Sequence, residues 1–89
     1  MPADITLEQN FPNPFNPSTV ISFSLPAASN VSIHVFDILG RDVATIVKGY
    51  LTAGKHVKEW NASGLPSGVY FYSLQAESFT QTKHMMLIR

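Results

Sequence analysis

The chain has 89 residues, of which 45% are hydrophobic and 13% charged, and its six basic side chains balance six acidic ones. A chain of this length forms one small domain, and its apolar content argues against intrinsic disorder. The zero net charge gives nucleic-acid binding no electrostatic support, no apolar run approaches the ~20 residues of a membrane span, and the absence of cysteine excludes a disulfide, a cysteine-ligated zinc site and a thiol nucleophile.

We expect residues 1–4 to be a linker remnant and residues 5–89 to form one domain, so the chain would be a domain of a longer protein. A short strand is predicted at residues 5–7, where apolar and polar side chains alternate.

Residues 10–18 contain three prolines, which exclude a helix or a central strand. We expect an ordered, extended loop held by Phe11 and Phe15, in which any of the three X–Pro bonds can be cis. One interpretation is a recognition surface like other proline-rich segments. The interpretation we favour is a rigid strap that caps one end of the domain and hides a strand edge.

Residues 19–25 and 31–36 alternate apolar and polar side chains, as half-buried strands do. We expect them to pair as an antiparallel hairpin with a turn at residues 26–30. The side chains predicted to face the core are Ile21, Phe23, Leu25, Val31, Ile33 and Val35.

Residues 37–41 are predicted to form a turn, because the Asp37 carboxylate can accept backbone N–H groups and Gly40 can adopt a positive φ. Residues 42–50 have apolar side chains at helical spacing but are rich in strand formers. We expect a strand, since the segment is short and its neighbours are strands.

Residues 55–61 are predicted to form a strand with His56, Lys58 and Trp60 on one face, and Trp60 is expected to pack in the core. A last strand is predicted at residues 79–88, polar at its start and apolar at its end.

Residues 65–74 combine a turn, set by Pro66 and Gly68, with a strand of aromatic and β-branched side chains. Both faces of this strand are largely apolar, so we expect a central strand covered on both sides. The Tyr70 hydroxyl either ties a corner, as in immunoglobulin-like sandwiches, or points into water.

Seven strands at 8–12-residue spacing, with no helix, predict an all-β fold: an immunoglobulin-like antiparallel β-sandwich without a disulfide. No catalytic pattern is found, so neither an enzyme nor a cofactor is expected. His34, His56 and His84 lie on three different strands without a second metal ligand on the same face. An oxygen-rich calcium site could use Asp37, Asp42 or the asparagine-rich loop at residues 10–18, but nothing specific favours one.

Four motifs then appear in order: Asn-Phe-Pro-Asn-Pro-Phe-Asn-Pro-Ser-Thr at 10–19, Asp-Ile-Leu-Gly-Arg at 37–41, Leu-Pro-Ser-Gly-Val-Tyr at 65–70 and Lys-His-Met-Met-Leu-Ile-Arg at 83–89. Together they resemble the C-terminal sorting domains (type A-like) of the type IX (Por) secretion system, over nearly the whole chain. That family is related to the immunoglobulin-like domain of flagellar hook-capping proteins.

The resemblance implies an address on an N-terminally fused cargo protein rather than an enzyme. It implies reading in the periplasm by the outer-membrane translocon and its shuttle protein, removal by a sortase, and delivery of the cargo to the cell surface or the medium. The closing strand and the two turns would be the recognition elements. By carry-over from the family motifs, the recognition residues would be Pro12, Asn13, Pro14, Phe15, Asp37, Gly40, Arg41, Pro66, Gly68, Tyr70, Lys83, Met85, Leu87 and Arg89.

The resemblance has one departure, Lys58, which stands where related sequences commonly carry an apolar residue and so leaves the register of that strand open. Two alternatives remain. The domain could be a structural assembly module, as in hook-capping proteins, or a carbohydrate-binding module with an aromatic platform made by Phe36, Tyr50 and Phe71.

Overall fold

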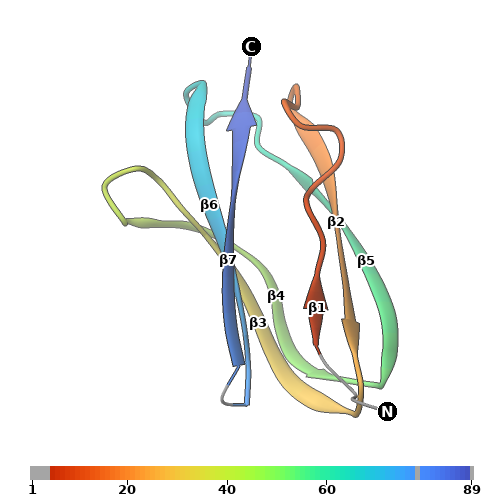
Figure 1. Ribbon diagram of the computed structural model, residues 1–89. Coiled ribbons are helices and arrows are strands. Elements are labelled where there is room, and N and C mark those ends of the chain that lie inside the picture. The colour runs from red at the N-terminus through yellow and green to blue at the C-terminus, as the bar shows by residue number, and fades with distance from the viewer. Residues whose placement is uncertain (1–4, 78, 89) are drawn as a thin grey trace.

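The computed structural model describes residues 5–77 and 79–88 and forms two antiparallel sheets that face each other (Figure 1). The sheets have the strand orders β1-β2-β5 and β4-β3-β6-β7. The predicted all-β, immunoglobulin-like sandwich is confirmed, and no helix that could cross a membrane is found in the described part of the chain. The strands are β1 Thr6–Leu7, β2 Ser18–Leu25, β3 Ser29–Phe36, β4 Asp42–Leu51, β5 Gly54–Asn61, β6 Gly68–Ala76 and β7 Phe79–Leu87.

The predicted hairpin between β2 and β3 is wrong, because these two strands lie in different sheets. Residues 26–28 carry the chain from one sheet to the other. Both strands bury every second side chain, and these apolar faces meet across the core instead of lying side by side. The alternation of apolar and polar residues therefore predicted the buried face of each strand correctly, but it did not determine which strand lies beside it in the sheet.

β6 is central, as predicted, and pairs with β3 on one side and β7 on the other. Its inward face carries Tyr70, Tyr72 and Leu74, which are buried. The expectation that both faces are covered is wrong, since Phe71 on the outer face is 36% exposed. The opposing sheet can cover only one face of this sheet.

The segments with open questions at the sequence level form regular strands. β4 is a strand as predicted, although its register with β3 shifts at two places. β5 pairs with β2 over eight consecutive positions without a shift, so Lys58 does not disturb the register. Trp60 is half-buried at the margin of the core, where its ring lies 6.0 Å from that of Phe15.

The strap predicted at residues 10–18 is confirmed with shifted bounds, since the connection between β1 and β2 spans residues 8–17, and it contacts both sheets. On one side the backbone of Phe11 exchanges hydrogen bonds with Val20 of β2 (2.9 and 3.0 Å). On the other side Phe15 bonds to the end of β7, through its N–H to Met86 O and its C=O to the Ile88 N–H, both at 2.9 Å. The strap thus hides part of the β7 edge.

The two aromatic side chains of the strap have different roles. Phe15 is buried in the core, as expected, but the side chain of Phe11 is 78% exposed, so only its backbone holds the strap. The expectation that both rings pin the loop is therefore wrong for Phe11. The peptide bonds before Pro12, Pro14 and Pro17 are all cis.

The hydroxyl of Tyr72 connects the strap to the central strand. It donates to Glu8 O and accepts from the N–H of Asn10, both at 2.8 Å. The Asn10 side chain in turn donates to Thr19 Oγ1 (2.9 Å) and to Pro12 O (3.2 Å). Burial raises the pKa of Tyr72 to about 12, although the bond from the Asn10 N–H acts in the opposite direction. Every buried polar side-chain atom among the described residues has a partner.

Replacing Tyr72 by Phe should lower the free energy of unfolding by about 1–3 kcal/mol, because the buried Asn10 N–H and Glu8 C=O lose their partner. The phenol ionises near pH 10.0 when unfolded but near 12 when folded, so its contribution is complete below pH 10 and is lost as the pH rises through 12. Urea unfolding followed by Trp60 fluorescence from pH 8 to 12 measures both effects.

The matched control is Tyr50→Phe, since the Tyr50 side chain is exposed on β4. The stability difference between wild type and Tyr72→Phe should shrink above pH 10, whereas Tyr50→Phe should follow the wild type. A constant difference across this pH range would contradict the assigned role of the hydroxyl.

Candidate recognition site

The turn at residues 37–41 is built around the Asp37 carboxylate. Its Oδ1 accepts from the backbone N–H groups of Leu39 (2.9 Å) and Arg41 (3.0 Å), and its Oδ2 accepts from Arg41 Nε (2.8 Å). Gly40 has a φ of +82°, which favours glycine. These contacts, chiefly the Arg41 N–H, lower the pKa of the Asp37 carboxyl. The predicted turn is confirmed.

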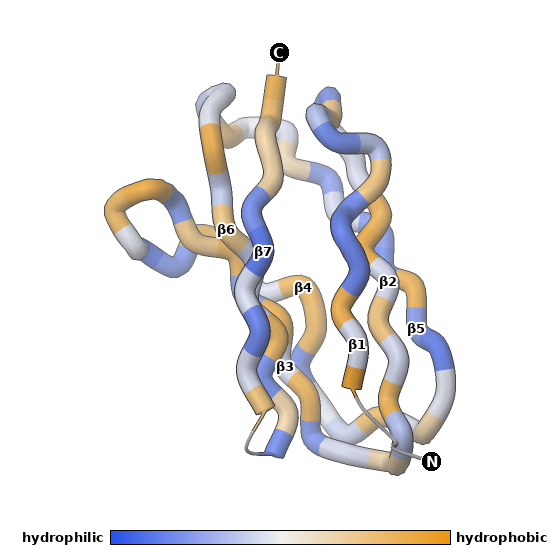
Figure 2. The backbone as a smooth tube through the Cα atoms, viewed as in Figure 1, coloured by the Kyte–Doolittle hydropathy of each residue, from blue (hydrophilic) through white to orange (hydrophobic). Residues whose placement is uncertain are grey.

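The tip of this turn presents two apolar side chains to solvent. Ile38 is 70% exposed and Leu39 is 72% exposed. The turn projects from the side of the sandwich, and its tip is one of the strongly hydrophobic stretches of the chain (Figure 2). Because the Asp37 carboxylate bonds the backbone of the turn, the turn is ordered with both side chains at exposed positions.

The second motif, residues 65–70, is fixed by a tyrosine corner. The Tyr70 hydroxyl donates to Pro66 O at 2.6 Å, and its ring is buried. Of the two readings of Tyr70, the corner is confirmed and the water-facing hydroxyl is wrong. Gly68, with a φ of +151°, begins β6 directly after this corner.

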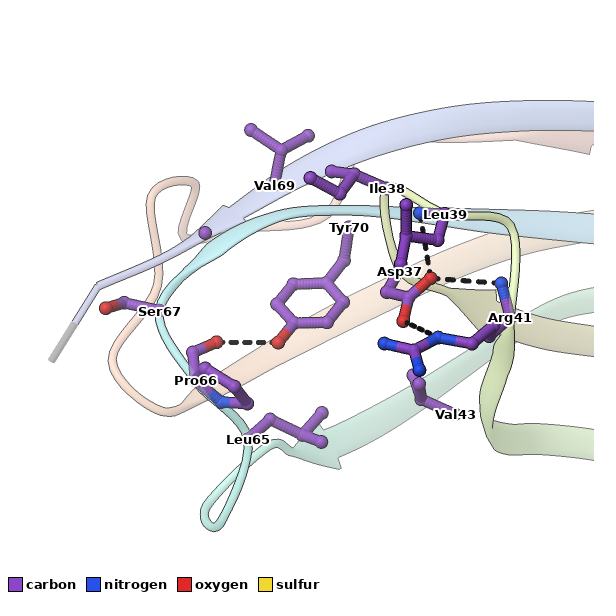
Figure 3. Close-up of a pocket in the computed structure, with 11 residues that line it drawn as sticks. Asp37, Ile38, Leu39, Arg41, Val43, Leu65, Pro66, Ser67, Val69 and Tyr70 are labelled. Carbon is purple, nitrogen blue, oxygen red and sulfur yellow. Dashed lines mark hydrogen bonds and ion pairs between the residues drawn. The ribbon is translucent and has the colours of Figure 1, made fainter.

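The two motifs meet at one apolar groove of about 510 Å³ (Figure 3). The Asp37 turn forms one wall, and the Pro66 corner with the start of β6 forms the other. Asp37 and Arg41 pair with each other, so the walls carry no unpaired charge from this turn. The apolar and aromatic side chains that line the groove are Ile38, Leu39, Val43, Leu65, Val69 and Tyr70.

The other two motifs lie together at the same end of the sandwich (Figure 1). The strap residues Pro12, Asn13 and Pro14 are exposed, and Asn13 Oδ1 accepts the Met86 N–H at 3.0 Å. The structure therefore brings the opening and closing motifs into direct contact.

The alternation of the closing strand divides its side chains into two sets. Met85 and Leu87 are buried in the core, whereas Met86 and Ile88 between and beside them are exposed. Lys83 is half-buried, and Arg89 lies outside the described residues. Met85 and Leu87 thus hold the strand in place. The side chains available for contact are those of Met86 and Ile88, which are not among the recognition residues expected from the family motifs.

The polar residues that hold the strap were missed at the sequence level. Asn10 and Thr19 are buried polar residues, and Gln9 Nε2 donates to His84 O at 2.7 Å. The sequence places Tyr70 and Tyr72 on the same face of β6, which indicates that their rings are buried. It does not indicate which distant segment the Tyr72 hydroxyl contacts.

The histidines do not assemble a site. His34 Nδ1 lies 3.0 Å from Asp42 Oδ2, and His56 stacks on Phe23 at 5.3 Å, while His84 lies on the outer face of β7. Residues 5–77 and 79–88 contain no group of three or more histidine and acidic side chains that could hold a metal ion.

The aromatic platform that a carbohydrate-binding module needs is not formed. Phe36 and Phe71 are neighbours in the sheet, but Tyr50 is paired with Asn30, six residues along β3 from Phe36. At ~3.3 Å per residue this puts Tyr50 about 20 Å from the other two. The three rings lie on the same outer face of the sheet but are too far apart to form one platform.

Replacing Asp37 by Ala should speed hydrogen exchange at the Leu39 and Arg41 amides, because their acceptor is removed, while the core amides of β3 and β6 stay protected. In the wild type, the Asp37 carboxylate orders the turn at pH values above 3.8, the usual pKa of an aspartate carboxyl. This order is lost as the pH falls through the pKa of Asp37 in the folded domain, which is lower than 3.8.

The control for this exchange measurement is Asp42→Ala, whose carboxylate contacts His34 instead of the turn. Unchanged exchange at Leu39 and Arg41 in Asp37→Ala would show that the carboxylate does not hold the turn.

Comparison with known protein families assigns the chain. The family described as secretion system C-terminal sorting domain matches residues 9–88, and no curated protein matches the chain. The match includes all four motifs almost to their ends, and it implies an N-terminal cargo and export to the cell surface or the medium. The chain belongs to this family and is a C-terminal sorting signal of the type IX secretion system.

Proposed function

We propose that the outer-membrane translocon of the type IX system, with its shuttle protein, reads this domain in the periplasm, and that a sortase then separates it from its cargo. The observation that carries this proposal is the groove, which joins the Asp37 turn to the Pro66 corner. Strap and closing strand meet at the same end of the sandwich, whereas β1, where the cargo side of the chain enters, begins at the opposite end (Figure 1).

Desolvation of apolar surface supplies the driving force for this recognition. Ile38 and Leu39 are large, exposed and already fixed by the Asp37 hydrogen bonds, so binding orders few additional groups. The Asp37–Arg41 pair is internal to the turn, which favours a partner surface with an apolar pocket over a strongly charged one.

The sortase cut is expected on the N-terminal side of β1. From Glu8 onward the strap is bonded into the sandwich, first through the Glu8 N–H to Ser22 O at 2.9 Å. A protease needs an extended, unpaired backbone segment, and the strap does not offer one without local unfolding.

The experiment fuses residues 4–89 to the C-terminus of a periplasmic reporter in a host with a type IX system, beside a strain that lacks the translocon. The wild-type fusion should reach the surface or the medium only when the translocon is present. The double variant Ile38→Ser/Leu39→Ser should lose most export, although its free energy of unfolding should change by no more than about 0.5 kcal/mol per site.

The matched control is Val57→Ser on β5, which removes an exposed apolar side chain (57% exposed) from the other sheet and should export normally. A native sorting tail of the host controls for host mismatch. Retention of the folded wild-type fusion in the periplasm, with the native tail exported, would contradict the proposal and favour an assembly module.

A further inference from the structure

We propose that the first part of β7, Phe79–His84, is a strand-addition edge that takes an extended polypeptide segment of the partner. This inference rests on the proposed function, because the partner is the type IX translocon. We call these six residues the open edge. They lie on the outermost strand of the four-stranded sheet, so one side of their backbone has no neighbouring strand among residues 5–77 and 79–88.

The hydrogen-bond pattern shows which backbone groups face outward. Met86 gives its N–H to Asn13 Oδ1 and its C=O to the Phe15 N–H, so both groups point away from β6. Outward and inward residues alternate in an antiparallel pair, and the register with β6 is unbroken over β7. Thr80, Thr82 and His84 therefore also face outward.

These outward groups are largely unused. His84 O accepts from the Gln9 side chain, but no partner is found within the described residues for the outward N–H and C=O of Thr80 and Thr82 or for the N–H of His84. Their spacing matches that of an added strand.

The remainder of the same edge already accepts an added segment from within the chain. Phe15 pairs with Leu87 as a parallel bridge and fills the edge near the end of β7. β7 is therefore geometrically able to bind another extended backbone. The last contact between the strap and this edge is the bond from Gln9 Nε2 to His84 O, and the open edge extends from His84 back toward Phe79.

The other edges of the sandwich are less suited. β1 has only two residues, and β4 is interrupted by register shifts. β5 places Lys55, Lys58 and Glu59 at exposed positions, and such charges discourage strand addition. The open edge is regular, and its exposed threonines favour strand pairing.

The charge of the open edge favours a different chain over a second copy. Lys83 is its only permanently charged residue, so pairing of two copies would add two lysines and no carboxylate to one interface. A partner strand with an Asp or Glu opposite Lys83 would be complementary. We therefore assign the occupant as an extended translocon segment with an acidic side chain at that place.

The decisive variant is Thr82→Pro in the reporter fusion. Proline at this outward position removes the N–H offered to the partner and leaves the bonds to β6 intact. Thr82→Ala controls for the side chain, which donates to Ser73 Oγ at 3.2 Å. Glu59→Pro is the matched edge control on β5. Val20, the partner of Glu59 on β2, directs its backbone N–H and C=O toward Phe11 and therefore away from β5. The backbone N–H and C=O of Glu59 consequently also face outward, away from β2.

Thr82→Pro should reduce export at least tenfold, while Thr82→Ala and Glu59→Pro should export like the wild type. Normal export of Thr82→Pro together with the wild type would overturn the strand-addition edge but leave the proposed function standing. Failure of the wild-type fusion itself, with a native tail exported, would overturn both.

Hydrogen exchange provides a test that does not depend on how well the proline variant folds. The Thr80, Thr82 and His84 amides of the wild-type domain should exchange more slowly when the detergent-solubilised translocon is added, and the Glu59 amide should not change. No slowing at the open edge would overturn the proposal. Slowing in the domain alone at high concentration, with dimers in sedimentation, would assign the edge to a second copy and overturn it as well.

Discussion

The hydroxyl of Tyr72 is the buried contact on which the attachment of the strap to the central strand depends. It donates to Glu8 O and accepts from the Asn10 N–H. These two bonds, one on each side of Gln9, tie the strap to β6. The strap then holds the end of β7 through Phe15 and Asn13. The Tyr72 hydroxyl thus fixes the start of the strap, and the bonds of Phe15 and Asn13 fix its end against the closing motif.

A small domain that serves as an address needs rigidity more than chemistry. The carboxylate of Asp37 and the hydroxyl of Tyr70 fix two short turns, each through bonds to backbone groups. Both turns border one groove, and its exposed apolar side chains lie on a backbone that these bonds hold in place. The resulting surface is apolar and ordered in the free domain, and such preorganisation lowers the entropic cost of binding.

Local patterns predicted the local structure, and distant contacts escaped them. Alternation located the strands, and Asp37 with Gly40 identified its turn, because these signals lie within a few residues of their effect. The pairing of β2 was wrong because the same apolar face can be buried by a neighbour or by the opposing sheet. The contact between Tyr72 and Asn10 spans 62 residues and leaves no trace in either segment.

The central claim is that the translocon reads the end of the sandwich that carries the groove. The most direct measurement places a photo-cross-linking amino acid at Leu39, on the groove, or at Ala53, at the opposite end between β4 and β5, and follows cross-links during export. The account predicts efficient cross-linking to the translocon from Leu39 and little from Ala53. Equal cross-linking from both positions, or a stronger product from Ala53, would contradict it.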